Sequence, residues 1–147
     1  MEQAVQQFIL AHRVARLATA DADGEPSVIP ICYVFDAGSI YSPVDEKPKS
    51  VGPNDLKRLR NIRENNRVSV VIDDYSEDWS QLAYLVIRGL AEIIEPAEPD
   101  RDEHTKGVTM LRTKYPQYRS MSIEARPMIK IKPMLWKMWR PAATLHG

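Results

Sequence analysis

The sequence has very little cysteine, because Cys32 is the only one among 147 residues. A single thiol can form neither an internal disulfide nor a cysteine-based zinc site. The histidines, His12, His104 and His146, lie in distant segments and share no helix or strand face with a second potential ligand. We therefore expect no metal centre, in a chain that suits a reducing compartment such as the cytoplasm.

Long apolar runs, targeting signals and excess charge are also missing. No stretch approaches the roughly 20 apolar residues that span a bilayer. The N-terminal stretch MEQAVQQFILAHR begins with an acidic residue and lacks the basic region and cleavage site of a secretory signal. Lys and Arg balance Asp and Glu at 20 each, which argues against a dedicated nucleic-acid binder. These features predict a soluble cytoplasmic protein with no membrane or nucleic-acid partner.

The common catalytic and nucleotide-binding motifs do not occur. Neither a GxGxxG turn nor a GxxxxGK[ST] loop is present, so both phosphate-loop fingerprints are absent. There is no GxSxG elbow, and Cys32 lies in an expected strand without a clear histidine partner, so nucleophilic catalysis has no support. This pattern fits a protein in which a bound cofactor carries the chemistry and the chain supplies position, electrostatics and water exclusion.

The pattern of apolar and turn residues predicts one domain, residues 1–147, with six or so strands and two or three short helices. Strands are expected at 14–20, 27–35, 39–44, 67–73, 82–94 and 128–139, and helices at 2–13, over about ten residues from 55, and at 100–115. Pro30 predicts an edge or irregular strand, and Gly89 predicts a bulge. Because most strands follow one another through short turns, we expect a mainly β, antiparallel barrel with peripheral helices.

Positive charge gathers in residues 47–67, KPKSVGPNDLKRLRNIRENNR. This segment holds seven of the chain's 20 Lys and Arg residues and only two acidic residues. On the helix that it is expected to form, with Asn54 as its cap, Arg58 and Arg60 flank the apolar stripe while Lys57 points to solvent. A flanking arginine near the first turn is able to aim its planar guanidinium at an anion, helped by free amides at the helix start.

Two interpretations of this segment stay open. In one, Arg58, with Lys57 or Lys49 and loop amides, binds a phosphate. In the other, the segment is a solvated helix face on which Glu64 pairs with Arg60 for only about 0.2–0.5 kcal/mol. From residue chemistry alone, the solvated face is favoured, because runs of charge usually face water.

A family resemblance adds weight to the first interpretation. The stretches that carry it are RVARLATADADGEPSVIPICYVF, SIYSPVDEKPKS, LKRLRNIRENNRVSVVIDDYSEDWS, LVIRGLAEII and WKMWRP. In order and spacing they resemble the pyridoxamine 5'-phosphate oxidase-like superfamily of FMN- or deazaflavin-binding proteins, over residues 8–141. The resemblance implies an antiparallel split β-barrel of the flavin reductase type, and a homodimer with the cofactor at the subunit interface.

The same resemblance implies where a cofactor phosphate binds. Arg58 falls where the oxidases hold the phosphate with a lysine, and Lys57 falls where they have an adjacent arginine. The two residue types are swapped here, so which of them contacts the phosphate stays open. Lys49 belongs to a loop that is longer than in the oxidases, and we expect it to approach the same phosphate.

Two strands are expected to border the cofactor ring. Tyr41 and Ser42, in IYSP, match the strand that lies beside the ring and phosphate. The backbone of Pro30, Ile31 and Cys32, in VIPICY, matches the strand along the ring edge. By its residue type alone, Cys32 is most simply a small buried side chain.

Aromatic residues late in the chain have two interpretations each. Trp79, in SEDWS, is either a loop anchor or a surface that stacks on the cofactor ring. Trp136, Trp139 and Arg140 resemble the C-terminal motif through which the oxidases contact the flavin of the neighbouring subunit, although the spacing is shorter and a leucine is missing. Alternatively, the last strand packs its aromatic side chains across a dimer interface. We expect Trp79 and Arg140 to close the site.

These features together predict an oxidoreductase that transfers a hydride to or from an unsaturated small-molecule acceptor, with the deazaflavin coenzyme F-420 or FMN as cofactor. The deazaflavin is favoured by the KPK loop, which resembles a deazaflavin-associated branch of the superfamily. The surplus of lysine and arginine also favours it, because its oligoglutamate tail is acidic. The alternative is an FMN- or haem-binding split barrel with a sensor or storage role and no turnover. No constellation of side chains indicates the substrate.

Overall fold

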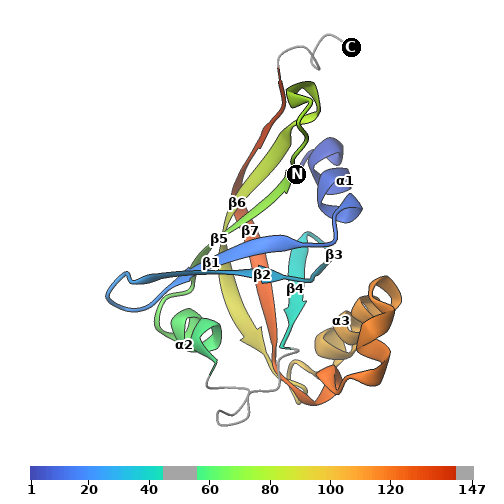
Figure 1. Ribbon diagram of the computed structural model, residues 1–147. Coiled ribbons are helices and arrows are strands. Elements are labelled where there is room, and N and C mark those ends of the chain that lie inside the picture. The colour runs from blue at the N-terminus through green and yellow to red at the C-terminus, as the bar shows by residue number, and fades with distance from the viewer. Residues whose placement is uncertain (45–55, 142–147) are drawn as a thin grey trace.

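The computed structural model describes residues 1–44 and 56–141, which form one antiparallel sheet of seven strands with helices around it (Figure 1). The strands are β1 Ala15–Ala20, β2 Pro26–Ile31, β3 Val34–Asp36, β4 Ser39–Pro43, β5 Arg67–Asp74, β6 Ala83–Ile94 and β7 Met128–Trp139. The helices are α1 Gln3–Ala11, α2 Lys57–Glu64 and α3 Arg101–Lys114, with short 3-10 turns at η2 Trp79–Gln81, η3 Pro116–Ser120 and η4 Ile123–Ala125. The mainly β, antiparallel prediction is confirmed.

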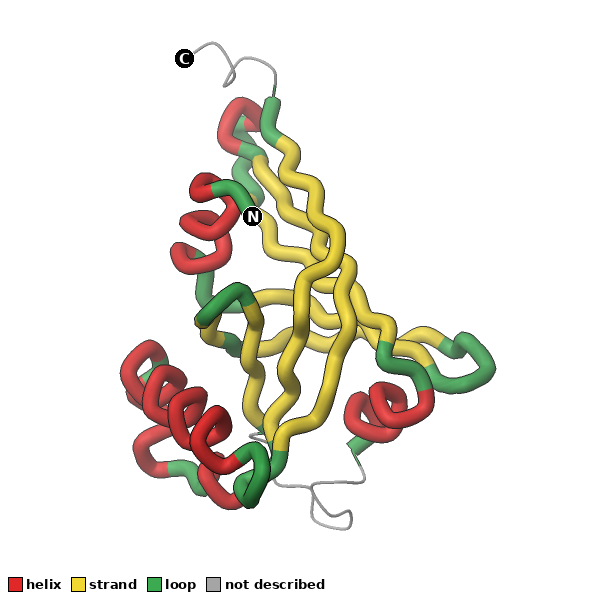
Figure 2. Tube along the Cα trace, turned by 180° about the vertical axis from the view of Figure 1, so that it is seen from behind, coloured by secondary structure: helices red, strands yellow, loops and turns green. Residues whose placement is uncertain are grey.

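The order of the strands explains why the sheet is a split barrel. Across the sheet the order is β2-β1-β5-β6-β7-β4-β3, so β2 and β3 occupy opposite edges. These two strands are neighbours in the chain, joined only by Cys32 and Tyr33. The sheet must therefore curl until its two edges meet at this short connection, which we call the crossing. Figure 2 shows the curled sheet from behind, with the helices outside it.

The structure corrects two details of the sequence prediction. The segment 27–35 was expected to be one strand, but it divides at the crossing into β2 and β3. The helix expected from residue 55 begins at Lys57, with Leu56 at the cap position, and the expected cap Asn54 lies outside the described residues. Pro30 does lie on an edge strand, as expected, because an edge position leaves no ladder hydrogen bond for it to break.

The longest ladder joins β6 to β7 and contains the predicted bulge. The pairing register shifts between Arg88 and Gly89, where Gly89 faces Pro133. A Cβ added at Gly89 would lie 2.5 Å from the carbonyl oxygen of Lys132. Only glycine permits this close approach of the two backbones, which confirms the expected bulge and gives its physical reason.

Two clusters of buried side chains hold the structure together. The larger one fills the barrel and includes Leu17, Ile72 and Ile87. The smaller one lies between α3 and the β3–β4 edge and includes Leu111 and Tyr115. All five residues of β4 are buried because the strand has the barrel on one face and α3 on the other. Among the described residues, no helix is both long and apolar enough to cross a bilayer.

Candidate functional site

A small cavity lies at the crossing, where the end of β2 meets β4. Its volume is about 200 Å³, and we call it the seam pocket. Its lining residues are Val14, Pro30, Ile31, Cys32, Ser42, Pro43 and Arg58. Five of the ten residues predicted to bind a cofactor are among them, brought from three separate segments of the chain: Pro30, Ile31, Cys32, Ser42 and Arg58.

The docking of α2 explains why Arg58 reaches the seam pocket. Leu59 and Ile62 are buried against the barrel, and the Nδ2 of Asn61 donates a hydrogen bond to the Oγ1 of Thr19 in β1 at 3.0 Å. With that face turned inward, Arg58 retains only 8% exposure. The solvated-face interpretation therefore fails for this arginine, because a solvated arginine keeps its head group in water.

The neighbouring basic residues of α2 behave differently. Lys57 is exposed, as the helical pattern predicted, and Arg60, which was expected to flank the apolar stripe as Arg58 does, is exposed as well. The amides of Leu59 and Arg60 both donate to the carbonyl oxygen of Leu56, so these two are not free anion donors as was expected of the helix start. Arg58 is consequently the side chain of α2 that the structure aims at the pocket, and Lys49 lies outside the described residues.

Ser42 fixes one wall of the seam pocket. Its hydroxyl donates a hydrogen bond of 2.9 Å to the carbonyl oxygen of Cys32, and its side chain is buried. This bond joins β4 to the crossing across the split of the barrel. The Cys32 thiol is free and half-buried beside it.

Tyr41 lies on the other face of β4 and does not line the seam pocket. Successive side chains of a strand point to opposite faces, so Tyr41 and Ser42 do not both face one cavity. The Tyr41 hydroxyl donates to Glu103 of α3 at 2.6 Å, and the same carboxylate pairs with Lys130 of β7 at 2.5 Å. Burial and the hydrogen bond to Glu103 raise the pKa of Tyr41, while Lys130 and Tyr41 lower the pKa of Glu103. This cluster fastens α3 to the sheet.

Neither Trp79 nor Arg140 lines the seam pocket of its own chain. Trp79 is 69% exposed in η2, at the end of the β5–β6–β7 ribbon that points away from α2 (Figure 1). The guanidinium of Arg140 lies 5.8 Å from the ring of Phe8 in α1, near the same end. A single chain therefore does not bring these two residues to Arg58.

The crossing is held by residues that the sequence did not single out. The Tyr33 amide donates to the hydroxyl of Tyr115 at 3.1 Å, and that hydroxyl faces the carbonyl oxygen of Tyr33 at 3.0 Å. Lys114 Nζ donates to the same carbonyl at 3.0 Å and to that of His12 at 2.7 Å. Because these partners are some 80 residues apart in the sequence, no local sequence pattern predicts the hydrogen bonds between them.

Burial sets the ionisation of this cluster. Burial, with the nearby Arg13 charge as a second cause, lowers the pKa of Lys114 to about 8. Burial also raises the pKa of Tyr115 to about 12, so its hydroxyl keeps its proton at neutral pH. Desolvation disfavours the charged form in both cases, which is why one pKa falls and the other rises.

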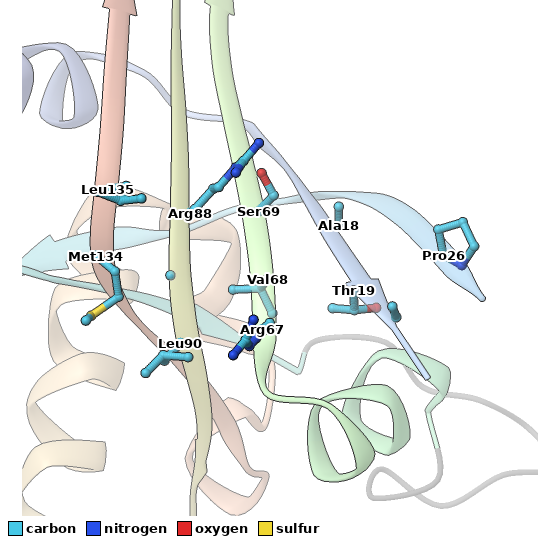
Figure 3. Close-up of a pocket in the computed structure, with 12 residues that line it drawn as sticks. Ala18, Thr19, Pro26, Arg67, Val68, Ser69, Arg88, Leu90, Met134 and Leu135 are labelled. Carbon is cyan, nitrogen blue, oxygen red and sulfur yellow. The ribbon is translucent and has the colours of Figure 1, made fainter. Parts of the chain in front are cut away.

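A larger cavity than the seam pocket lies elsewhere, on the outer face of the sheet, and we call it the outer groove (Figure 3). Its volume is about 580 Å³, and it extends over β1, β5, β6 and β7. Leu90, Met134 and Leu135 are exposed in it, with Arg67 and Arg88 beside them. Exposed apolar side chains that gather on one surface are typical of protein–protein contacts. The size of this groove does not make it the cofactor site, because most of the predicted binding residues lie elsewhere.

Residues 1–140 match a family model described as pyridoxamine 5'-phosphate oxidase. The chain belongs to this family. The match extends over nearly the whole chain, from α1 to the end of β7. Membership in the pyridoxamine 5'-phosphate oxidase family agrees with the split barrel and with a flavin-type oxidoreductase class.

One curated relative is the 5a,11a-dehydrotetracycline/5a,11a-dehydrooxytetracycline reductase of Streptomyces rimosus subsp. rimosus. It is 28% identical over 98 residues, which cover 66% of this chain and 66% of the relative. The match therefore spans slightly less than two thirds of the relative's own length.

Solved structures of this fold have several described roles. A conserved hypothetical protein from Mycobacterium tuberculosis has a TM-score of 0.76 at 21% identity, over 95% of this chain and 85% of its own. The haem storage protein HutZ from Vibrio cholerae has a TM-score of 0.71 at 15% identity, over 95% and 93%. An F-420 reductase has a TM-score of 0.67 at 19% identity, over 93% and 98%. At these identities the likeness shows the fold alone.

Proposed function

We propose that this family member is an oxidoreductase that binds coenzyme F-420 or FMN and transfers a hydride to or from an unsaturated small molecule. The observation that carries the proposal is the buried Arg58 facing the seam pocket, at the position where the family binds a cofactor phosphate. A guanidinium matches a phosphate with two parallel hydrogen bonds, and such charge-assisted bonds are among the strongest in proteins.

The residues of the seam pocket have separate roles in this proposal. Arg58 binds the phosphate, and low exposure strengthens its attraction because water screens the pair less. The backbone at Pro30 to Cys32 borders the ring, and Ser42 keeps that backbone in place through the Cys32 carbonyl. When bound, the cofactor supplies the hydride chemistry, so the chain needs no nucleophile or metal of its own.

Between the two cofactors, we favour the deazaflavin. FMN ends at one phosphate, whereas F-420 continues into an acidic oligoglutamate tail that needs more cations. Arg60 and Arg63 are exposed on α2 close to Arg58. Lys47 and Lys49, which are expected to help, lie outside the described residues. The name of the F-420 reductase with the same fold supports this choice, and that of the curated relative supports a reductase.

We also propose that the protein is a homodimer with the cofactor between its subunits. Leu90, Met134 and Leu135 in the outer groove are exposed, and a second copy would remove them from water. In a two-fold dimer, the ribbon end of one subunit is free to approach the pocket of the other. That arrangement gives Trp79 and Arg140 their predicted role, which a single chain does not.

Haem storage without turnover is the competing function within this fold. Both described histidines already have partners: His12 contacts Asp74 at 2.6 Å, and His104 contacts the carbonyl oxygen of Arg126 at 2.6 Å. The second ring nitrogen of His12 contacts the carbonyl oxygen of Phe8 at 2.7 Å, and His104 is buried, so neither imidazole offers an accessible nitrogen to an iron. We therefore favour the redox enzyme over the haem protein.

Titration of the purified protein with FMN, with F-420 and with haem, followed by fluorescence and absorbance, tests the proposal. We expect saturable F-420 binding near one cofactor per chain and weaker FMN binding. A Soret band on adding haem, with no response to either flavin, would overturn it. Size measurement in solution tests the dimer, which the charged substitution Leu135→Glu is expected to dissociate.

Turnover is a separate measurement. Reduced cofactor should be consumed when an unsaturated acceptor such as a quinone or an enone is added to the complex. Binding without consumption of any such acceptor would leave a cofactor-binding protein and remove the enzyme from the proposal.

A further inference from the structure

The crossing lacks the hydrogen bonds that normally hold a strand. Cys32 and Tyr33 belong to neither β2 nor β3, so no sheet ladder pairs their backbone. An unpaired backbone group that is buried costs free energy comparable to a lost hydrogen bond, and proteins supply a partner from side chains where the ladder fails. The partners at the crossing are the side chains of Ser42, Lys114 and Tyr115.

Tyr115 has a special place among these partners. Its hydroxyl accepts from the Tyr33 amide at 3.1 Å. It also faces two carbonyl oxygens, that of Tyr33 at 3.0 Å and that of Arg13 at 2.8 Å. The one hydroxyl group thus joins the crossing to the start of β1, on both sides of the barrel opening.

The ring of Tyr115 does not require this hydroxyl for packing. The ring meets Tyr118 edge-on at 5.6 Å within the smaller apolar cluster. A phenylalanine would fill the same space without burying a polar atom. The hydroxyl contributes hydrogen bonds to the backbone instead, and the backbone that it holds leads directly into the wall of the seam pocket at Cys32.

We propose that Tyr115 is a positioning residue for the cofactor: its hydroxyl accepts from the Tyr33 amide and shares its one proton between the carbonyl oxygens of Tyr33 and Arg13, which fixes the Pro30–Cys32 wall of the seam pocket. This inference rests on the proposed function for the identity of the ligand. The mechanical role of Tyr115, which is to hold the wall of the seam pocket in place, does not depend on it. Lys114 supports the same carbonyl through its ammonium group. Tyr115 does not itself line the pocket.

The single cysteine makes the mechanical role directly measurable. Cys32 is the only thiol in the chain, is half-buried and lines the seam pocket, so the change in its labelling rate from wild type to variant reports how firmly this wall is held. We expect Tyr115→Phe to raise the labelling rate by roughly 5- to 30-fold, because local opening loses the bonds that oppose it. Exchange of the Tyr33 amide hydrogen should accelerate in parallel.

Val108→Ala is the matched control. Val108 is buried in the same cluster as Tyr115, so its truncation lowers global stability without removing a bond from the crossing. At equal global stability, Tyr115→Phe must exceed Val108→Ala in both the labelling rate and the exchange rate of the Tyr33 amide. Equal rates in the two variants would overturn the positioning role and leave Tyr115 a packing residue.

A ligand experiment separates this inference from the proposed function. Saturating F-420 or FMN is expected to slow Cys32 labelling in the wild type. Tyr115→Phe is expected to weaken binding of the same cofactor by roughly 3- to 10-fold at unchanged stoichiometry. If neither cofactor binds the wild type, the proposed function fails while the labelling comparison still decides whether Tyr115 holds the wall. If the cofactor binds equally to the wild type and to Tyr115→Phe, Tyr115 does not position the cofactor, whereas the proposed function stands.

Discussion

Arg58 and Lys114 are two cationic side chains that are partly or wholly withdrawn from water, and each lines a cavity, but their partners differ. The ammonium of Lys114 lies on the carbonyl oxygens of His12 and Tyr33 and 4.0 Å from the centre of the Tyr33 ring. Arg58 lies at an open cavity whose wall is strand backbone. Lys114 thus directs its donors to two backbone carbonyls, whereas Arg58 lines a cavity together with residues that are expected to border a cofactor.

The surroundings of Lys114 follow from the ends of two helices. Its ammonium bonds the His12 carbonyl just beyond α1, while Arg13 donates to the carbonyl oxygen of Lys114 at the end of α3. Cations are stabilised at helix C-termini, where the last carbonyls have no intrahelical partner. The two basic residues therefore cap each other's helices. A buried cation with an adjoining cavity does not by itself identify a binding site, because Lys114 also lines a cavity, of about 270 Å³. What distinguishes Arg58 is that Pro30, Cys32 and Ser42, which are expected to border a cofactor, line the same cavity.

The largest expected effect is on cofactor affinity, which should depend on Arg58 and not on its exposed neighbours. Arg58→Met keeps the apolar stem and removes the charge, and we expect the cofactor dissociation constant to rise roughly 10- to 100-fold, since a charged hydrogen bond contributes about 1.5–3 kcal/mol. Arg60→Met, at an exposed arginine further along α2, is the control when the ligand is FMN, which has no acidic tail, and it should change FMN affinity less than twofold. Equal losses in both variants would show a diffuse charge effect instead of a specific contact.

The second effect concerns stability. Lys114→Met removes two hydrogen bonds to backbone carbonyls, and we expect the free energy of unfolding at pH 7 to fall by roughly 1–2 kcal/mol. Cofactor affinity should fall only a few-fold, because Lys114 touches the crossing and not the ligand. Chemical denaturation and titration of the same sample give both values. A loss of affinity as large as that of Arg58→Met would erase the distinction between the two cations.

The third effect is a pH dependence of Lys114. Its pKa is about 8 when folded, against an ordinary value of 10.5, so between these values the unfolded chain holds a proton that the folded chain has released. Stability contributed by this residue must therefore rise from about pH 8 to about pH 10.5. Lys114→Met should lack that rise. Identical pH profiles of the two proteins would exclude a depressed pKa.

The smallest effect tests the other face of β4. Tyr41→Phe removes the hydrogen bond to Glu103, and we expect a loss of about 1 kcal/mol in the free energy of unfolding. The substitution leaves the ion pair of Glu103 with Lys130 in place. No loss, measured by denaturation at neutral pH, would show that the ion pair alone fastens α3.

Much of this architecture was predictable from the sequence. Regular alternation and branched residues gave β5 and β6 nearly to the residue, and Gly89 gave the bulge. The helical pattern of α2 correctly separated Arg58 from the exposed Lys57, since helical periodicity determines which side chains face the barrel. These features depend on neighbours within one or two turns or strands.

What the sequence did not predict depends on remote partners. The division of 27–35 at the crossing is stabilised by Ser42, Lys114 and Tyr115, none of which is adjacent in sequence. The resemblance placed Tyr41 and Ser42 in one site, but strand alternation sends their side chains to opposite faces. Trp79 and Arg140 remain predictions, because their role needs a second chain.

The bulge at Gly89 and Pro133 also bends β6 and β7. From the bulge, the Ala83–Arg88 part of β6 and the part of β7 after Pro133 continue as the ribbon that ends at η2, while Leu85 and Ile87 still belong to the larger buried cluster. A side chain at residue 89 would force the backbones of β6 and β7 apart and change the direction of the ribbon. In a two-fold dimer the substitution is present in both subunits. A single added methyl group at residue 89 would therefore change the direction of both β5–β6–β7 ribbons without contacting either seam pocket.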